Sequence, residues 1–339
     1  MAKVFLTGAT GFVGGDFLHR FASSAASKYA ISALVRNADK AQQISSQYPS
    51  VKVVQGDLDD SQLVEKEARN ADIVLHLAST KHIASSKAIQ RGLTDPARSK
   101  PGYWIQISGA TLLAIDEIKN ARFGFESDKV YDDIRDIKEI LSTIKNNPSR
   151  DVDNLVAGQD SSKVKTALIV GPHIYGKGRG PGNQRSVQAP EIARVTLQLK
   201  EGFRLNEGKN SWSYIHVHDL SDLFASLVDA AAETKPGLWN DEGIYTPENG
   251  SLTFGELSEK IAAEAKKQDL IPEGSVKKVL DAQGVDALSG HASILWGTNA
   301  VLGSSRARSL LHWKPSRPSL EETLPEIVRI EGQKQSNRL

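Results

Sequence analysis

Short apolar runs alternate with segments of helical periodicity along the first half of the chain. A short apolar run between polar turns predicts a buried strand, and a helical segment between two such strands predicts the crossover of a parallel sheet. The predicted strands are residues 4–6, 31–35, 51–54, 73–77, 104–107 and 166–170. We therefore expect an α/β fold with a Rossmann-type doubly wound parallel sheet, covered by helices on both faces.

The character of the chain changes after Gly171. A loop rich in glycine and proline, GPHIYGKGRGPGNQ, is followed there by helical patterns and shorter apolar runs. We expect a dinucleotide-binding Rossmann domain over residues 1–176 and a mainly substrate-binding part over residues 177–339, with residues of about 210–235 returning to the first domain. The second part is expected to close over the carboxyl ends of the strands, where open α/β sheets bind ligands.

The first predicted strand runs directly into TGATGFVG, residues 7–14, and an amphipathic segment over residues 12–21 follows. This order predicts a dinucleotide site, because the glycines allow a tight turn, a close approach of backbone to a pyrophosphate, and close packing of helix on strand. The helix N-terminus adds unpaired N–H groups and a partial positive charge. The residues expected to bind the cofactor here are Thr7, Gly8, Ala9, Thr10, Gly11, Phe12, Val13 and Gly14.

The end of the second predicted strand bears on the choice of cofactor. An acidic residue there would bind the ribose 2′-OH of NAD, but the strand ends in Val35 and Arg36, and the first carboxylate is Asp39. Arginine suits a 2′-phosphate through charge-assisted bonds, and Lys40 adds a second cation nearby. The pattern favours NADP(H) over NAD(H), and the alternative for Arg36 is a solvated surface side chain.

Composition narrows the function. The chain has 339 residues, 39% of them hydrophobic, a net charge of +1 and no cysteine. There is no basic excess for nucleic acid or membranes, no disulfide framework and no thiolate nucleophile. The closest histidine pair, His216 and His218, fits one strand rather than a metal site. With no signal-like leader and no long apolar stretch, we expect a soluble cytoplasmic protein, monomeric or homodimeric, with a small-molecule substrate and no metal.

Several motifs in a fixed order resemble the extended short-chain dehydrogenase/reductase superfamily, which includes sugar-nucleotide epimerases and dihydroflavonol-type reductases. They are TGATGFVG, GDL at 56–58, HLAS at 76–79, ISGAT at 107–111, GPHIYG at 171–176, YIHVHDL at 214–220 and SSRARSLLHWKP at 304–315. The resemblance, closest to NAD-dependent epimerases and dehydratases, implies that Asp57 and Leu58 flank the adenine. It also implies that Leu77, Ala78 and Ser79 line the ribose and nicotinamide side, and that Pro172, His173 and Ile174 lie against the carboxamide.

The chain departs from that family where proton transfer is expected. The family uses a Ser or Thr at the end of the fifth strand and a YxxxK pair on the helix before the sixth, because a nearby cation must stabilise the phenolate. The segment before the sixth strand, SRDVDNLVAGQD, contains neither residue. Tyr131 and Arg135 form YxxxR on a predicted amphipathic surface helix, in acidic surroundings that oppose a phenolate. Ser108, Gly109 and Thr111 compete for the position that the family gives to this hydroxyl.

Two other side chains are candidates for proton transfer. His82 is expected on the loop above the nicotinamide, and Tyr175 at the border of the substrate pocket, with Asn183 as a further substrate-binding residue. The sequence favours an NADP(H)-dependent oxidoreductase that moves a hydride to or from a carbonyl or alcohol of a small organic, possibly secondary-metabolite, substrate. The alternatives are a non-redox epimerase, dehydratase or cyclase, and a nucleotide-sensing protein without turnover.

Overall fold

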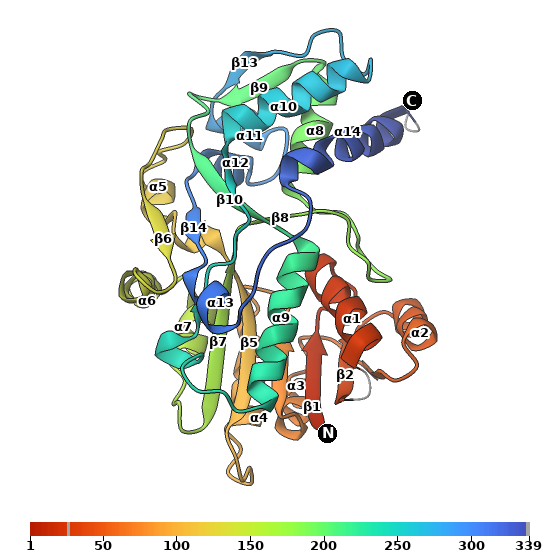
Figure 1. The fold of residues 1–339 in the computed structure, drawn as a ribbon, viewed down its shortest axis with the longest axis vertical. Helices are drawn as coiled ribbons and strands as arrows, with labels where there is room; N and C mark the ends of the chain where they lie inside the picture. The colour runs from red at the N-terminus through yellow and green to blue at the C-terminus, as the bar shows by residue number, and fades with distance from the viewer. Residues whose placement is uncertain (26–27, 337–339) are drawn as a thin grey trace.

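The computed structural model describes residues 1–25 and 28–336, and its main feature is a seven-stranded parallel sheet (Figure 1). The strands are β1 (Ala2–Thr7), β2 (Tyr29–Val35), β3 (Lys52–Gln55), β4 (Ile73–His76), β5 (Gly102–Gly109), β7 (Val164–Gly171) and β11 (Ile244–Tyr245). Their order is β11-β7-β5-β4-β1-β2-β3. The order reverses between β1 and β4, which makes the carboxyl ends of these strands the expected ligand crevice. The predicted fold class and all six predicted strands are confirmed, and β11 is additional.

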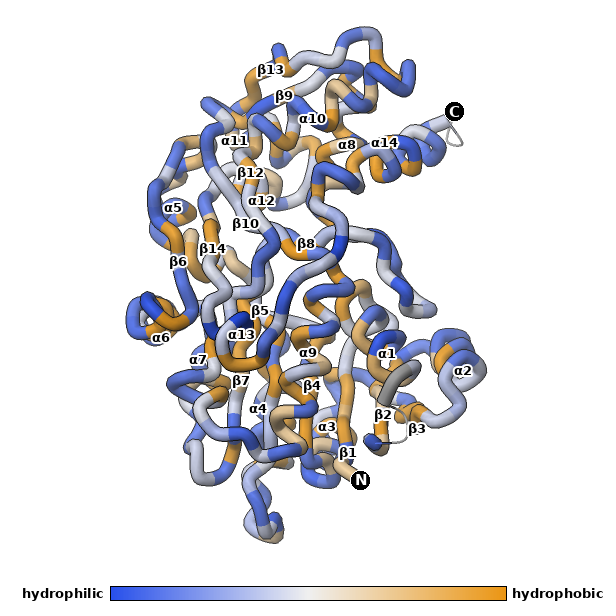
Figure 2. The backbone as a smooth tube through the Cα atoms, viewed as in Figure 1, coloured by the Kyte–Doolittle hydropathy of each residue, from blue (hydrophilic) through white to orange (hydrophobic). Residues whose placement is uncertain are grey.

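Helices cover both faces of this sheet, as the nearly continuous burial of its central strands requires. One face packs on α1 (Phe12–Ala25), α2 (Ala38–Gln47) and α9 (Val217–Ala232). The other face packs on α3 (Ser61–Asn70), α4 (Ile83–Leu93), α6 (Ile137–Lys145) and α7 (Asp151–Ala157). In Figure 2 the strands of the sheet carry much of the hydrophobic colour. None of the helices in the described part of the chain is both long enough and apolar enough to span a membrane.

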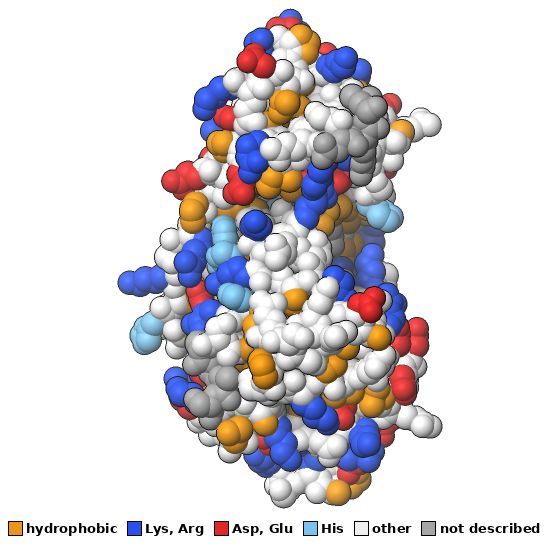
Figure 3. Space-filling view, turned by 90° about the vertical axis from the view of Figure 1, so that its right-hand side faces the viewer, with side chains coloured by type: hydrophobic (Ala, Val, Ile, Leu, Met, Phe, Trp, Pro, Cys, Tyr) orange, Lys and Arg blue, Asp and Glu red, His pale blue; other side chains and the backbone are white. Residues whose placement is uncertain are grey.

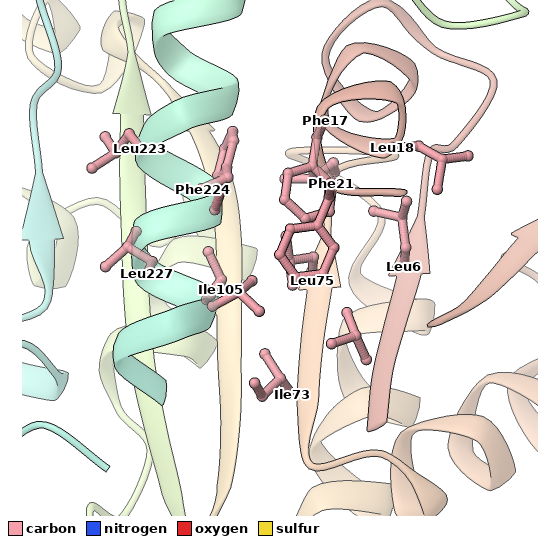
Figure 4. Packing of buried hydrophobic residues seen from close by; sticks show 14 of the residues in the cluster. Leu6, Phe17, Leu18, Phe21, Ile73, Leu75, Ile105, Leu223, Phe224 and Leu227 are labelled. Atoms are coloured by element: carbon pink, nitrogen blue, oxygen red, sulfur yellow. The ribbon is translucent and has the colours of Figure 1, made fainter. Parts of the chain in front are cut away.

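Aromatic packing joins α1 to α9 over the sheet. The rings of Phe17 and Phe21 stack with their centroids 5.1 Å apart, and Phe224 of α9 meets Phe17 edge-on at 6.2 Å. Figure 4 shows these rings together above Leu75 and Ile105 of the strands. This contact fixes α1, whose first turn forms the candidate nucleotide site, against a helix from the C-terminal half of the chain.

A second body of structure lies beyond the carboxyl ends of the strands, in the upper half of Figure 1. Its small sheets contain β8 (His173–Tyr175), β10 (Ser211–His216) and β12 (Ser251–Thr253), and β9 (Gly202–Leu205) with β13 (Val276–Leu280). Its helices include α8 (Gln188–Leu199), α10 (Phe254–Lys267), α11 (Ala282–Asp286), α12 (Ala292–Gly297) and α14 (Leu320–Ser336), and these share a separate core. Between the two bodies lie α5 (Ile115–Lys119), β6 (Val130–Asp132), β14 (Val301–Gly303) and α13 (Ser305–Leu310).

The expected surface helix around Tyr131 is wrong for residues 130–132. Tyr131 lies in β6, which pairs in parallel with β14, and α6 begins only at Ile137. The side chain of Asp132 accepts the backbone N–H groups of Ile134 and Arg135, which turns the chain directly after the strand. A pairing partner about 170 residues away and an aspartate turn therefore override the local helical pattern.

We predict that Phe224→Ala lowers the free energy of unfolding by about 3–5 kcal/mol, the range for truncating a buried aromatic residue. Phe224 is fully buried between α9 and α1. Chemical denaturation followed by circular dichroism measures the loss, with Val279→Ala at a half-exposed position as the control. A loss at Phe224 no larger than that of the control would contradict this account of the core.

Candidate functional site

The turn between β1 and α1 is too tight for side chains at two of its glycines. Gly8 has a φ of +84°, and a Cβ added there would lie 2.7 Å from the backbone N of Ala78. A Cβ on Gly14 would lie 2.3 Å from the Gly8 carbonyl oxygen, whereas one on Gly11 would lie 3.2 Å from the same oxygen. The turn thus holds β1, α1 and the end of β4 together. Its geometry fits a pyrophosphate at the N-terminus of α1.

The residues expected at the adenosine end gather beyond β2 and β3. Arg36 is exposed, and its Nη1 lies 3.4 Å from Oδ2 of Asp57. Asn37 caps α2 by accepting the backbone N–H of Lys40, so Lys40 stands in the first helical turn. The backbone N–H of Asp59 lowers the pKa of the Asp57 carboxyl, and the charge of Arg36 lowers it further. This carboxyl is therefore ionised at neutral pH. Arg36 and Lys40 thus lie next to the position where a ribose would sit.

A chain of hydrogen bonds links the loops that follow β1, β3 and β4. Nδ1 of His76 lies 2.6 Å from Oγ1 of Thr7, and its Nε2 lies 3.1 Å from Oγ of Ser85. Nδ1 of His82 lies 2.9 Å from the same Oγ of Ser85, and its Nε2 lies 3.0 Å from Oδ1 of Asp59. His82 is also the N-cap residue of α4. Burial lowers the pKa of His76 to about 3, so that ring stays neutral. The structure therefore places His82 beside the loop after β3, and sequence reasoning missed the role of His76 in holding these loops.

The end of β5 carries a polar cluster of three side chains. Ser108 is buried, and Nη2 of Arg150 donates to its Oγ at 2.9 Å. Nε of Arg150 donates to Oδ2 of Asp153 at 2.6 Å. Burial raises the pKa of Asp153, although the Arg150 charge and a hydrogen bond with Ser108 act to lower it. A cation thus stands next to Ser108, one of the hydroxyl candidates from the sequence.

Arg150 was missed in the sequence because a lysine was sought at helical spacing from a tyrosine. The signal that could have found it is the Arg–x–x–Asp spacing of Arg150 and Asp153 at the start of α7. Thr111, the other candidate hydroxyl, lies in a 3₁₀ turn over Ala110–Leu112, partly exposed.

The surroundings of Tyr131 do not favour a phenolate. Burial and the Glu139 carboxylate raise the pKa of its phenol, although Lys129 lies 4.8 Å from the ring centre. The guanidinium of Arg135 donates to Asp136 and to the Val130 carbonyl. The proposed YxxxR pair is therefore not arranged as a dyad.

The segment after β7 packs into the second body of the protein. The ring of His173 stacks on Trp212 with centroids 4.3 Å apart, and desolvation lowers its pKa to about 3. The hydroxyl of Tyr175 donates to the Pro318 carbonyl at 2.6 Å, and burial raises the pKa of its phenol. Both rings are thus used in packing, while Pro172 and Ile174 flank them beyond the end of β7.

The structure places Asn183 against the nucleotide turn, in the segment that follows β8. Its backbone N–H donates to the Thr10 carbonyl at 3.0 Å. Its side chain bonds to the backbone of Arg185. No group of three or more His, Cys, Asp or Glu residues able to hold a metal occurs among the residues that the structure describes.

Two of the cavities in the described structure lie apart from the polar cluster. One of about 970 Å³ lies at the amino-terminal edge of the sheet, next to Asp72, Tyr103 and Trp239. Parallel sheets bind ligands at the opposite edge, so its size does not make it the cofactor site. A second cavity, of about 470 Å³, lies between the loop after β8 and α14, next to His216 and Ile327.

A family model described as NAD(P)H-binding matches residues 8–113. Over its whole length the chain is similar to a protein named "Oxidase ucsJ" from Acremonium sp, with 35% identity over 343 residues and 98% of each chain covered. The chain belongs to the extended short-chain dehydrogenase/reductase superfamily.

Solved structures agree with this dehydrogenase/reductase fold. The dTDP-glucose 4,6-dehydratase DesIV from Streptomyces venezuelae superposes with a TM-score of 0.66 at 16% identity, covering 98% of both chains. Gre2 from Candida albicans gives a TM-score of 0.64 at 13% identity, covering 98% of this chain and 99% of its own. The resemblance seen in the sequence is thus confirmed for family and fold, and an NAD(P)-binding domain is shown.

Gly11 has more room for a side chain within the protein than Gly14 has, and this difference allows a test of the nucleotide site. We predict that Gly11→Val abolishes binding of NADPH and NADH while the fold persists, because its branched side chain would occupy the space of the pyrophosphate. Gly14→Ala should instead impair folding, since its Cβ would meet the Gly8 carbonyl.

Calorimetric titration and circular dichroism make this measurement. The control is Gly290→Val, because a Cβ at Gly290 would have no atom within 4 Å. Micromolar dinucleotide binding by Gly11→Val would show that the cofactor lies elsewhere.

Proposed function

We propose that this protein is an NADP(H)-dependent oxidoreductase that acts on a carbonyl or alcohol of a small organic substrate by hydride transfer. The observation that carries the proposal is the buried Ser108 hydroxyl with Arg150 beside it, at the carboxyl end of β5 and two strands from the nucleotide turn. The name of the 35% identical relative, an oxidase, supports redox chemistry. We further propose a cytoplasmic monomer or homodimer without nucleic-acid or membrane partners.

The bound nicotinamide would supply the hydride chemistry, and the protein would supply orientation and charge. A hydroxyl has one hydrogen to donate and two lone pairs. Arg150 donates to Ser108, which leaves the hydroxyl hydrogen of Ser108 to be shared between the Asp153 carboxylate and a substrate oxygen. The guanidinium charge strengthens that donation and stabilises the negative charge that develops on the oxygen. Asp153 holds the guanidinium in position.

The preference for NADP(H) rests on the adenosine end. Within the described residues Arg36 pairs with Asp57, at 3.4 Å, and its side chain is 82% exposed, so its guanidinium is available to a 2′-phosphate. Lys40 and the N-terminus of α2 would add positive potential at the same place.

A non-redox epimerase, dehydratase or cyclase is the second candidate. It is favoured by α7, which carries neither the tyrosine nor the lysine of the family pattern. The third candidate is a nucleotide-sensing protein. The three are separated by following the nicotinamide absorbance of the purified protein with NADPH and a panel of aldehydes and ketones. Absorbance lost in step with product supports the oxidoreductase, a transient change supports the non-redox enzyme, and no change with any compound supports the sensor.

We predict that Arg36→Ala weakens NADPH binding by about 1–3 kcal/mol, the range for losing a charge-assisted contact, and leaves NADH binding nearly unchanged. Calorimetric titration of both nucleotides measures the effect. Arg91→Ala, which removes a surface arginine of α4 that pairs with Glu65, is the matched control. Equal or tighter binding of NADH by the unaltered protein would overturn the NADP(H) preference.

For a carbonyl compound that the panel shows to be reduced, we predict that Ser108→Ala lowers kcat/KM by about a hundredfold or more, as removal of an oxyanion donor does. Tyr131→Phe should lower it by less than about tenfold, because loss of a true general acid typically costs about a hundredfold. A loss near a thousandfold at Tyr131 alone would restore the tyrosine as the acid. Little effect at either position would argue against this site.

A further inference from the structure

Two residues directly after the glycine motif have no part in the pyrophosphate turn. Gly15 and Asp16 follow Gly14, which already provides the close contact of α1 with the turn. Yet Asp16 is fully buried. The N-terminus of α1 is expected to bind an anion, yet Asp16 places a buried negative charge in the second turn of the same helix. This placement needs an explanation.

The explanation is a segment that returns to α1 after β8, residues 176–184, which we call the strap. Its Arg179 donates to Asp16 from the backbone N at 3.0 Å, from Nε at 2.9 Å and from Nη2 at 2.7 Å. Ser221 donates to the same carboxylate at 2.7 Å, and Nε2 of His218 lies 3.5 Å from it. Burial raises the pKa of Asp16, but the bonds from Arg179 and Ser221 outweigh burial, so the carboxyl is ionised.

The glycines of the strap allow it to lie in backbone contact with the nucleotide turn. A Cβ on Gly182 would lie 2.0 Å from the Thr10 carbonyl oxygen, and one on Gly180 would lie 2.5 Å from the carbonyl carbon of Gly15. In Figure 1 the strap descends from β8 to the N-terminal end of α1. Figure 3 shows Lys, Arg and His side chains along the middle of the face on that side.

These contacts bear on the affinity for a diphosphate. The N-terminus of α1 attracts an anion through its partial positive charge, and the buried Asp16 carboxylate one turn away opposes it. With the strap in place little solvent reaches this carboxylate, so its charge would act on the diphosphate with little screening if Arg179 did not neutralise it. Arg179 places a compensating cation on the carboxylate, but only while the strap is in contact with α1.

We propose that the strap is the second wall of the dinucleotide site and that Arg179 is a positioning residue, which couples docking of the strap on α1 to binding of the diphosphate. The proposal rests on the proposed function only in taking NADPH or NADH as the ligand. Closing the strap neutralises Asp16 and encloses the cofactor, so the strap must move before the cofactor leaves.

The test measures the dissociation rate and the Kd of NADPH by nucleotide fluorescence and displacement, and it needs no substrate. Arg179→Met leaves the Asp16 charge uncompensated and should raise both quantities roughly ten- to a hundredfold. In the double variant Asp16→Asn with Arg179→Met the charge is gone, so most of the lost affinity should return. Gly182→Ala forces the strap off Thr10 and should raise the dissociation rate without changing any charge.

The matched controls are Arg91→Met for the arginine and Gly290→Ala for the glycine, and both should behave as the unaltered protein. Thermal melting checks each fold. If Arg179→Met does not fold, Gly182→Ala and the double variant still decide. Unchanged NADPH dissociation in Gly182→Ala, or no recovery in the double variant, would overturn the strap proposal alone. If the unaltered protein binds neither NADPH nor NADH, the strap proposal and the proposed function both fail.

Discussion

The close approach of α1 to the Gly8 carbonyl is the contact on which the rest of the site depends. No Cβ fits at Gly14 because the carbonyl oxygen would be 2.3 Å away, and none fits at Gly8 because the backbone of Ala78 is 2.7 Å away. One turn therefore sets the position of α1 relative to β1 and β4 together. The strap and the aromatic contact with α9 reach the same helix from the C-terminal half. Two segments from the C-terminal half of the chain thus meet on one helix, α1.

Two buried ion pairs border the site that this helix forms. Asp16 with Arg179 lies beside the nucleotide turn, and Asp153 with Arg150 lies beyond β5. A buried ion pair contributes little net stability, because desolvation offsets the attraction, but it is costly to break on one side. Such pairs therefore fix geometry rather than strengthen the fold. The Asp16–Arg179 pair joins segments 163 residues apart, whereas Arg150 and Asp153 are neighbours at the start of α7 and reach a distant segment through the bond from Arg150 to Ser108.

The sequence was sufficient for the elements whose signals are local. The six predicted strands and the turn at Gly8 need only apolar runs and glycine spacing, so these predictions are confirmed. The two residues of β11 carry no pattern of their own and become a strand only by pairing with β7. Tyr131 was placed on a helix because its partner strand, residues 301–303, is remote.

The site was harder to predict than the fold for the same reason. Arg150 acts on Ser108, 42 residues earlier, and no periodicity connects them. The burial of Asp16 depends on Arg179, 163 residues later. In both cases the function of the residue comes from a contact that only the folded chain creates. Cofactor preference and catalytic residues accordingly remain predictions, whereas family and fold are shown.

Under the proposed function, Ser108 and Arg150 work without the tyrosine and lysine of the family pattern, which changes what the site can do chemically. A guanidinium stays protonated at every relevant pH, so Arg150 stabilises charge but transfers no proton. His76 and His173 have pKa values of about 3. Both rings are therefore neutral across the physiological range, and neither supplies an acidic proton. Under the proposed function, the proton that completes carbonyl reduction therefore comes from a source other than these three side chains, such as water or His82. The protein's contribution is then to stabilise the oxyanion, a task for which a fixed cation is better suited than a titrating one.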